Sequence, residues 1–448
     1  MPGDPRTTGD ARTPETRTAG GAGRLALLPA PALPLVYFAG AHLSLGLACA
    51  ILVIDPTLPG GFHYHPRLIA LVHLVTLGWI SGSILGAFYI VGPLALGLPL
   101  PARRGDALAC AAFWIGTAAM VAGFWTGRYH LVGSGGLLVA TGPAWLAARV
   151  LRLRRTARMP AGVAPHVALA FGNVLGAAAL GLVMAFGRGT SWFRISPLAM
   201  ATAHAHLAVI GWAVMLIVGL SYRLVPMFLP AAMPSGRGLA VTAGLIEAGT
   251  LAIALALVTN TTPIAGALLV VAALALFARR LRGVLANRRP RPAEMRGRDW
   301  ATWQSHVALL WGVVACASGL RLAAGGAPSG WTWTYGVAGL LGFVSQMVVG
   351  IQGRLLPMHA WYRAMARLGG QPPEVSSHRL AAPRVALAVL GLWTISVPAL
   401  AAGLARGWPG AVAAGAAALL AAVVTQGVHG AVIVSRAGAS LPRRPPDR

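Results

Sequence analysis

Long runs of hydrophobic residues alternate along the chain with short polar or arginine-rich segments. Each run is about the length that an α-helix needs to cross roughly 30 Å of hydrocarbon. The pattern therefore predicts an all-α integral membrane protein with twelve transmembrane helices. The expected spans are residues 33–54, 66–93, 107–126, 132–149, 165–187, 196–226, 238–259, 262–278, 302–323, 332–353, 383–404 and 409–435.

These spans divide the 448 residues into three parts. Residues 1–32, rich in Pro, Gly, Thr and Arg, are expected to form a disordered cytoplasmic arm without the apolar stretch of a signal peptide. Residues 33–435 form the membrane domain, and residues 436–448 a cytoplasmic tail. No soluble cytochrome, copper or nucleotide-binding domain is expected.

Composition and charge support a membrane protein and give it an orientation. Apolar residues make up 56% of the chain and charged residues 10%, against about one quarter charged in soluble domains. The formal net charge is +26, and all 36 basic residues are arginine. Placing both termini in the cytoplasm puts every arginine inside, as the positive-inside rule requires, except Arg67, Arg128, Arg188, Arg194, Arg321 and Arg406. The arginines thus indicate orientation in a bacterial-type cytoplasmic membrane, not nucleic-acid binding.

An internal repeat predicts how the spans are grouped. The segment HLVTLGWISGSILGAFYIVGP (73–93) aligns without a gap with HLAVIGWAVMLIVGLSYRLVP (206–226), at an offset of 133. A weaker copy, GFVSQMVVGIQGRLLP (342–357), follows at an offset of 131. His42, His166 and His306 begin the helices that precede these copies, and we align them with one another. The sequence therefore predicts three pseudo-threefold-related units of four helices, about 33–149, 165–278 and 302–435, whereas a major-facilitator transporter has two units of six.

The repeated segments carry a resemblance to a known superfamily. TAHAHLAVIGW (202–212) followed by GLSYRLVP (219–226) resembles the tenth-helix signature of heme–copper oxidase catalytic subunits. Segment 73–93 resembles the heme-ligating second helix of those subunits and the histidine helix of the NnrS family. The resemblance implies a twelve-helix fold of three arcs and one or possibly two b-type hemes. It also implies electron transfer, or binding of a diatomic gas such as nitric oxide, with a quinol or separate protein as electron donor.

The chain departs from the superfamily at its copper site. The oxidases hold copper with one histidine on the sixth helix and a histidine pair on the seventh. Here the seventh span, 238–259, contains no histidine. Copper is possible but has no support in the sequence, and oxidase-type reduction of oxygen or nitric oxide is not expected. A transporter or metal-handling protein on the same scaffold, without heme, is the alternative function.

His73, His204 and His206 are the candidate heme ligands, because ionizable groups inside a membrane are costly and usually functional. The alternative is that they are core histidines bonded to carbonyls. Successive helical residues turn by about 100°, so His204 and His206 point about 200° apart and serve different neighbors. The repeat then pairs His73 with His204 across a heme, and turns His206 toward Tyr335. A five-coordinate heme or a metal at His206 is the extension of this prediction.

Several further residues have either a functional or a structural role. Glu247, in the seventh span, is either a proton relay or the partner of a structural hydrogen bond. Arg67, Arg194 and Arg321 can bind heme propionates, or be ordinary interfacial arginines. His359 and His378 are placed in a basic loop without a specific role.

Overall fold

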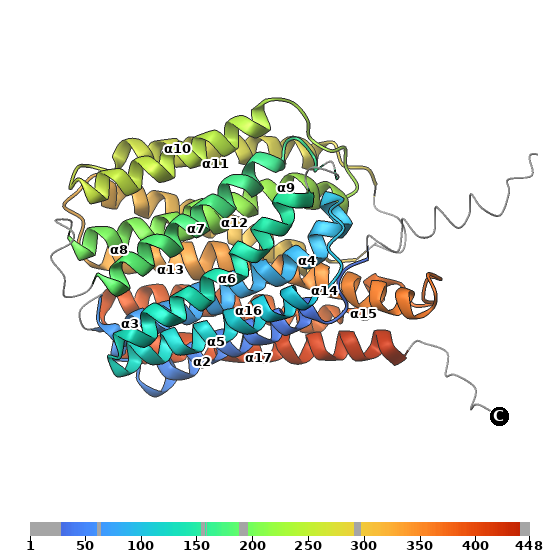
Figure 1. Ribbon diagram of the computed structural model, residues 1–448, viewed down its shortest axis with the longest axis horizontal. Coiled ribbons are helices and arrows are strands. Elements are labelled where there is room, and N and C mark those ends of the chain that lie inside the picture. The colour runs from blue at the N-terminus through green and yellow to red at the C-terminus, as the bar shows by residue number, and fades with distance from the viewer. Residues whose placement is uncertain are drawn as a thin grey trace, which may run out of the picture.

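The chain is described by a computed structural model of residues 28–60, 64–153, 157, 159–187, 196–290 and 297–439. These residues form helices and their connections, without a β-strand among them. Twelve of the helices are long and apolar enough to cross a membrane. The prediction of an all-α, multi-pass membrane protein is confirmed at this level. Figure 1 shows the helices side by side, with their long axes nearly parallel.

The helices lie close to the expected ranges. Nine spans are single helices: α2 (Leu33–Ile54), α5 (Arg104–Thr126), α6 (Tyr129–Leu153), α7 (Ala164–Phe186), α10 (Gly238–Val258), α11 (Ile264–Ala286), α12 (Trp300–Ala323), α16 (Pro383–Arg406) and α17 (Pro409–Ala439). The second, sixth and tenth spans each join two α-helices through a π-helical segment: α3 (Pro66–His73), η2 (Leu74–Ser81) and α4 (Gly82–Leu96); α8 (Pro197–His206), η3 (Leu207–Val214) and α9 (Met215–Phe228); α13 (Gly330–Val337), η5 (Ala338–Ser345) and α14 (Gln346–Arg367). A short 3₁₀ turn, η1 (Leu58–Gly60), and a short helix, α15 (Ser377–Leu380), complete the described elements.

The three composite spans lie at the center of the bundle, and we call them the inner spans. Buried residues make up 67%, 61% and 61% of their most apolar windows, against 17–44% in the other spans. Their π-helical segments contact one another. The other spans are apolar on their outward faces as well, and Leu43 on α2 is 75% exposed. This distribution is consistent with outer helices that contact lipid.

The π-helical segments follow the sequence repeat. η2, η3 and η5 each have 8 residues and begin at Leu74, Leu207 and Ala338, so they recur at the offsets 133 and 131. Each begins directly after the position occupied by His73, His206 and Val337. π-Helical turns are rare and frequently mark functional sites.

Glycines set the close approach of each inner span to the helix before it. A Cβ atom at Gly78 would overlap Ser44 of α2, one at Gly211 would overlap Asn173 of α7, and one at Gly342 would overlap Trp311 of α12. The positions match one another in the repeat. Only glycine permits this packing distance, as is common for small residues between membrane helices.

The packing corrects the expected alignment of His42 with His166. His166 packs against Gly219, whereas Gly86, which aligns with Gly219, meets Tyr37. Tyr37, more than one helical turn before His42, is therefore the counterpart of His166. The sequence comparison used the histidines to align these helices, but the register is set by the glycine contacts.

Candidate functional site

The imidazole rings of His73 and His204 face each other between two inner spans. His73 ends α3, and His204 lies in the last turn of α8. Their ring centroids are 6.4 Å apart, and the ring planes differ by 29°. Both α3 and α8 lie at the left end of the bundle in Figure 1. The structure thus brings together the two histidines that the helical angles paired.

Both rings bind a backbone carbonyl through Nδ1. The Nδ1 atom of His73 lies 2.8 Å from the carbonyl oxygen of Ile69, and that of His204 lies 2.8 Å from the carbonyl oxygen of Ala177. Because a carbonyl only accepts, each Nδ1 carries the proton and each Nε2 has a lone pair. Among the described residues the hydrogen bonds of these two rings are made by Nδ1 and none by Nε2. Metal-ligating histidines have this arrangement, with the second nitrogen held by a carbonyl.

Two neighbors fix the orientation of the rings. The ring of Phe124, on α5, stacks on His73 at a centroid distance of 5.2 Å and an angle of 28°. Gly181, on α7, leaves room for His204, because a Cβ atom there would lie 3.2 Å from its Cε1 atom. Two neutral, oriented imidazoles on adjacent helices fit the axial ligand set of a b-type heme.

His206 has a different partner. Its Nδ1 atom donates to the carbonyl oxygen of Thr202 at 2.7 Å, so Nε2 is the acceptor for the Tyr335 hydroxyl at 3.3 Å. The two rings are 6.1 Å apart between centroids and 22° from parallel. The structure therefore joins His206 to Tyr335 of the third inner span, as the helical angles predicted. A ligand at His206 Nε2 has to displace this hydroxyl.

The equivalent positions between the third and the first inner span carry no metal-ligating side chain. Val337 aligns with His73 and His206 in the repeat, and Leu71 aligns with His204. Val337 and Leu71 are both buried and belong to the main apolar core. Polar side chains thus face each other at two of the three equivalent interfaces between inner spans.

Glu247 is hydrogen-bonded. Its Oε2 atom accepts from Asn173 Nδ2 at 2.6 Å, and Asn173 is the residue that packs on Gly211 of the second inner span. Asn173 also donates to the carbonyl oxygen of Leu169 at 2.9 Å. The bond is compatible with either reading of Glu247, the structural one or the proton relay.

The predicted arginines have separate surroundings. The guanidinium of Arg67 lies over the ring of Trp125, 5.4 Å from its centroid. Arg321 donates to the carbonyl oxygens of Gly325 and Gly326 at 2.8 and 3.2 Å. Arg194 lies outside the described residues. Neither described arginine has a contact with the histidine pair.

The structure contains a buried ion pair that the sequence analysis missed. Arg149 Nη1 lies 2.6 Å from Asp106 Oδ2, and both side chains are buried. Asp106 Oδ1 accepts from Tyr89 Oη at 2.9 Å and from Trp145 Nε1 at 2.8 Å. Asp106 lies one residue before the expected span 107–126, in the first turn of α5, so the hydrophobic pattern did not predict its burial. The aligned pair Tyr89 and Tyr222 was the available signal.

His359 is also placed differently from the prediction. It lies in α14, which continues to Arg367, and its side chain is fully buried. Its Nε2 atom is 3.3 Å from the carbonyl oxygen of Pro31. The expected loop is wrong here because the arginines that lowered the hydropathy belong to a helix extending beyond the apolar part of the span.

Neither a protein family nor a curated protein matches the chain. The described residues contain no cluster of three or more His, Cys, Asp or Glu side chains placed to hold a metal ion. The candidate site is therefore defined by its geometry: two imidazoles facing each other between the first two inner spans, beside a histidine–tyrosine pair that reaches the third.

Proposed function

We propose that the protein is a membrane b-type heme protein in which His73 and His204 are the axial ligands of one heme. The observation that carries the proposal is the pair of facing imidazoles, each with Nδ1 held by a carbonyl and Nε2 left as a lone pair. When bound, a b-type heme supplies one-electron transfer at its iron. The residues supply the orientation: Phe124 holds one ring and α7 holds the other.

The proposed architecture is three four-helix units around a pseudo-threefold axis. It is supported by the recurrence of the π-helical segments at offsets of 133 and 131 and by the mutual contacts of the inner spans. With the arginine distribution, it puts both termini in the cytoplasm of a bacterial-type cell and the histidines in the outer third of the membrane. This arrangement matches the resemblance to heme–copper oxidase subunits and the NnrS family.

His206 and Tyr335 are proposed as the place where a small molecule meets the heme protein. The hydroxyl of Tyr335 occupies the Nε2 lone pair of His206. A second heme, a metal ion or a diatomic gas such as nitric oxide has to compete with this single neutral hydrogen bond, which is worth about 1 kcal/mol. The physiological donor of electrons is proposed to be a quinol or a separate protein.

The direct test is the absorption spectrum of the purified protein with a pyridine-hemochrome and metal analysis. A Soret band, with α and β bands on reduction and a heme b hemochrome, supports the proposal. A colorless preparation without heme overturns it. If that preparation holds a transition metal, the alternative of a metal-handling protein on this scaffold is supported.

Turnover separates a relay or gas-binding protein from an oxidase. Because the seventh span has no histidine, the isolated protein is expected not to reduce oxygen or nitric oxide at the rates of an oxidase. Gas consumption with an artificial electron donor measures this. Sustained consumption that is lost in His204→Ala or His206→Ala contradicts the proposed function.

A further inference from the structure

A large cavity lies at the end of the bundle opposite the histidine pair. Its volume is about 1750 Å³, and α2, α12, α14 and α17 contribute to its walls. In Figure 1 α14 and α15 lie at the right end, whereas α3, α8 and α13 lie at the left. The cavity is therefore separate from the site described above.

The third repeat has a glycine in the cavity wall at the position where the first two repeats have a buried tyrosine. Tyr89 and Tyr222 align in the first two repeats, are buried, and bond to Asp106 and to Thr242. The aligned residue in the third repeat is Gly353, which lines the cavity. The third repeat thus has no tyrosine ring or hydroxyl at this position of the wall.

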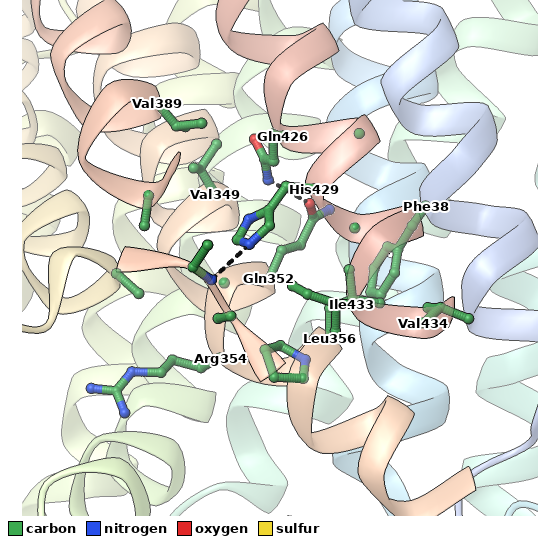
Figure 2. A pocket seen from close by; sticks show the side chains of 18 of the residues that line it. Phe38, Val349, Gln352, Arg354, Leu356, Val389, Gln426, His429, Ile433 and Val434 are labelled. Carbon is green, nitrogen blue, oxygen red and sulfur yellow. Dashed lines mark hydrogen bonds between the residues drawn. The ribbon is translucent and has the colours of Figure 1, made fainter. Parts of the chain in front are cut away.

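A chain of hydrogen bonds leads into the cavity from the center of the bundle. Gln352 Nε2 donates to Ser83 Oγ at 2.9 Å, and Gln426 Nε2 donates to Gln352 Oε1 at 3.0 Å. The remaining atom, Gln426 Oε1, is buried and has no partner among the described residues. Figure 2 shows Gln352, Gln426 and His429 together at the cavity. A buried acceptor without a donor costs free energy that a ligand hydroxyl recovers.

Two histidines add one donor and one more acceptor. His429 Nε2 accepts from the backbone N–H of Ala382 at 2.9 Å, so its Nδ1 carries a proton that it can donate. His42 donates from Nδ1 to the carbonyl oxygen of Phe38 at 2.8 Å, and its Nε2 is a buried acceptor without a partner in the described chain. Its ring lies against Gly427, next to Gln426.

The remaining walls are suited to an apolar chain. The cavity is lined by apolar side chains of two helices: Phe38, Leu43 and Leu47 on α2, and Val424 and Val428 on α17. All of them except Phe38 are also exposed on the outside of the bundle. Outward-facing apolar side chains of a membrane helix contact lipid. The cavity therefore joins a polar interior end to the hydrocarbon region.

We propose that this cavity binds a lipophilic molecule through a hydroxyl group. The hydroxyl hydrogen is donated to Gln426 Oε1, and its oxygen accepts from His429 Nδ1. A carbonyl in the same place only accepts and leaves Gln426 Oε1 unpaired. The cavity consequently prefers a hydroquinone, or a lipid alcohol with the same hydroxyl, over a quinone. This proposal does not depend on heme binding.

The test is equilibrium binding of three probes to the full-length protein in nanodiscs under anaerobic conditions. The probes are 2-decyl-1,4-benzohydroquinone, the corresponding quinone, and 1,2-dioctanoylglycerol. At least one hydroxyl probe is expected to bind about tenfold more tightly than the quinone. Binding of only the hydroquinone, or only the glyceride, supports the site and identifies the source of the hydroxyl. Equal affinity for all three, or no binding of either hydroxyl probe, overturns the proposal.

Variants locate the binding. Gln426→Leu removes the acceptor and is expected to weaken hydroxyl-probe binding about tenfold while leaving quinone binding unchanged. Gly353→Tyr restores the side chain of the other repeats and is expected to abolish binding of every probe. Thr425→Val, one residue away and outside the cavity lining, is the matched control. If Gln426→Leu, folded as judged by circular dichroism, binds the hydroxyl probes as tightly as the control does, the proposal is wrong.

Discussion

The rings of His73 and His204 lie 6.4 Å apart, while His206, two residues further along the same helix, bonds to Tyr335 at 3.3 Å on another span. The divergence follows from the α-helical turn of about 100° per residue, which points the two side chains to opposite flanks of α8. One histidine-rich stretch thereby serves two interfaces among the inner spans. This geometry gives each histidine a separate, testable role.

Alanine variants of the three histidines should differ in their heme spectra. His73→Ala and His204→Ala are each expected to remove the same low-spin heme signal, because each deletes one of the two proposed axial ligands. His206→Ala should largely retain it, since its Nε2 atom faces Tyr335. Optical and electron paramagnetic resonance spectra of the purified variants measure this. If His206→Ala loses the signal and His204→Ala retains it, the proposed pair is wrong and the partner of His73 is His206.

Gly181 should affect heme content through the space that it leaves for the His204 ring. Gly181→Val places carbon atoms where the His204 ring lies against α7, so the ring loses its orientation. We expect heme occupancy per protein to fall severalfold. Gly176→Val, on the same helix, meets nothing within 4 Å and should retain full occupancy. Equal occupancy in the two variants contradicts the role given to Gly181.

Tyr335→Phe should expose His206 to reagents. The change removes the hydroxyl that donates to His206 Nε2, a neutral hydrogen bond worth about 0.5–1.5 kcal/mol. Carbethoxylation of His206, followed by mass spectrometry, is expected to become severalfold faster, while the signal assigned to His73 and His204 stays the same. An unchanged rate of modification shows that the hydroxyl does not protect this nitrogen.

The Asp106–Arg149 pair should contribute strongly to stability. Asp106→Ala leaves Arg149 buried without its counter-charge and is expected to lower the free energy of unfolding by about 3–5 kcal/mol. The double variant Asp106→Leu with Arg149→Met should recover much of this loss. Denaturation in detergent, followed by tryptophan fluorescence, measures both. Asp55→Ala, which loses only two exposed bonds to Thr57, is the control, and a similar loss there contradicts the prediction.

The spans and the facing histidines were predictable because both depend on local rules. Hydropathy located twelve helices, and the turn per residue within α8 set the directions of His204 and His206. Register between helices was not accessible in this way: the counterpart of His166 is Tyr37, as the glycine contacts show. That contact depends on packing between distant segments, which a hydrophobic pattern does not record.

The cavity and the ion pair were missed for a related reason. Gln426 and His429 are ordinary interruptions of an apolar run until α14 is placed beside them. The replacement of Tyr222 by Gly353 in the repeat was visible in the sequence, but its effect depends on what fills the vacated space. Only the packed structure shows that Ala301 of α12 approaches Gly353 and that both residues line the cavity.

The π-helical segments have a consequence for reading such spans. A π turn contains more residues than an α turn, so the half of a span after Ser81 is rotated relative to the half before Leu74. A helical wheel with α-helical spacing can therefore fit only one half of the span, and it assigns the side chains of the other half to the wrong faces. Deleting a single residue from η2 would therefore rotate His73 away from His204 while leaving the hydropathy profile unchanged. Relatives aligned by hydrophobicity alone can share twelve spans and still place their histidines at different interfaces.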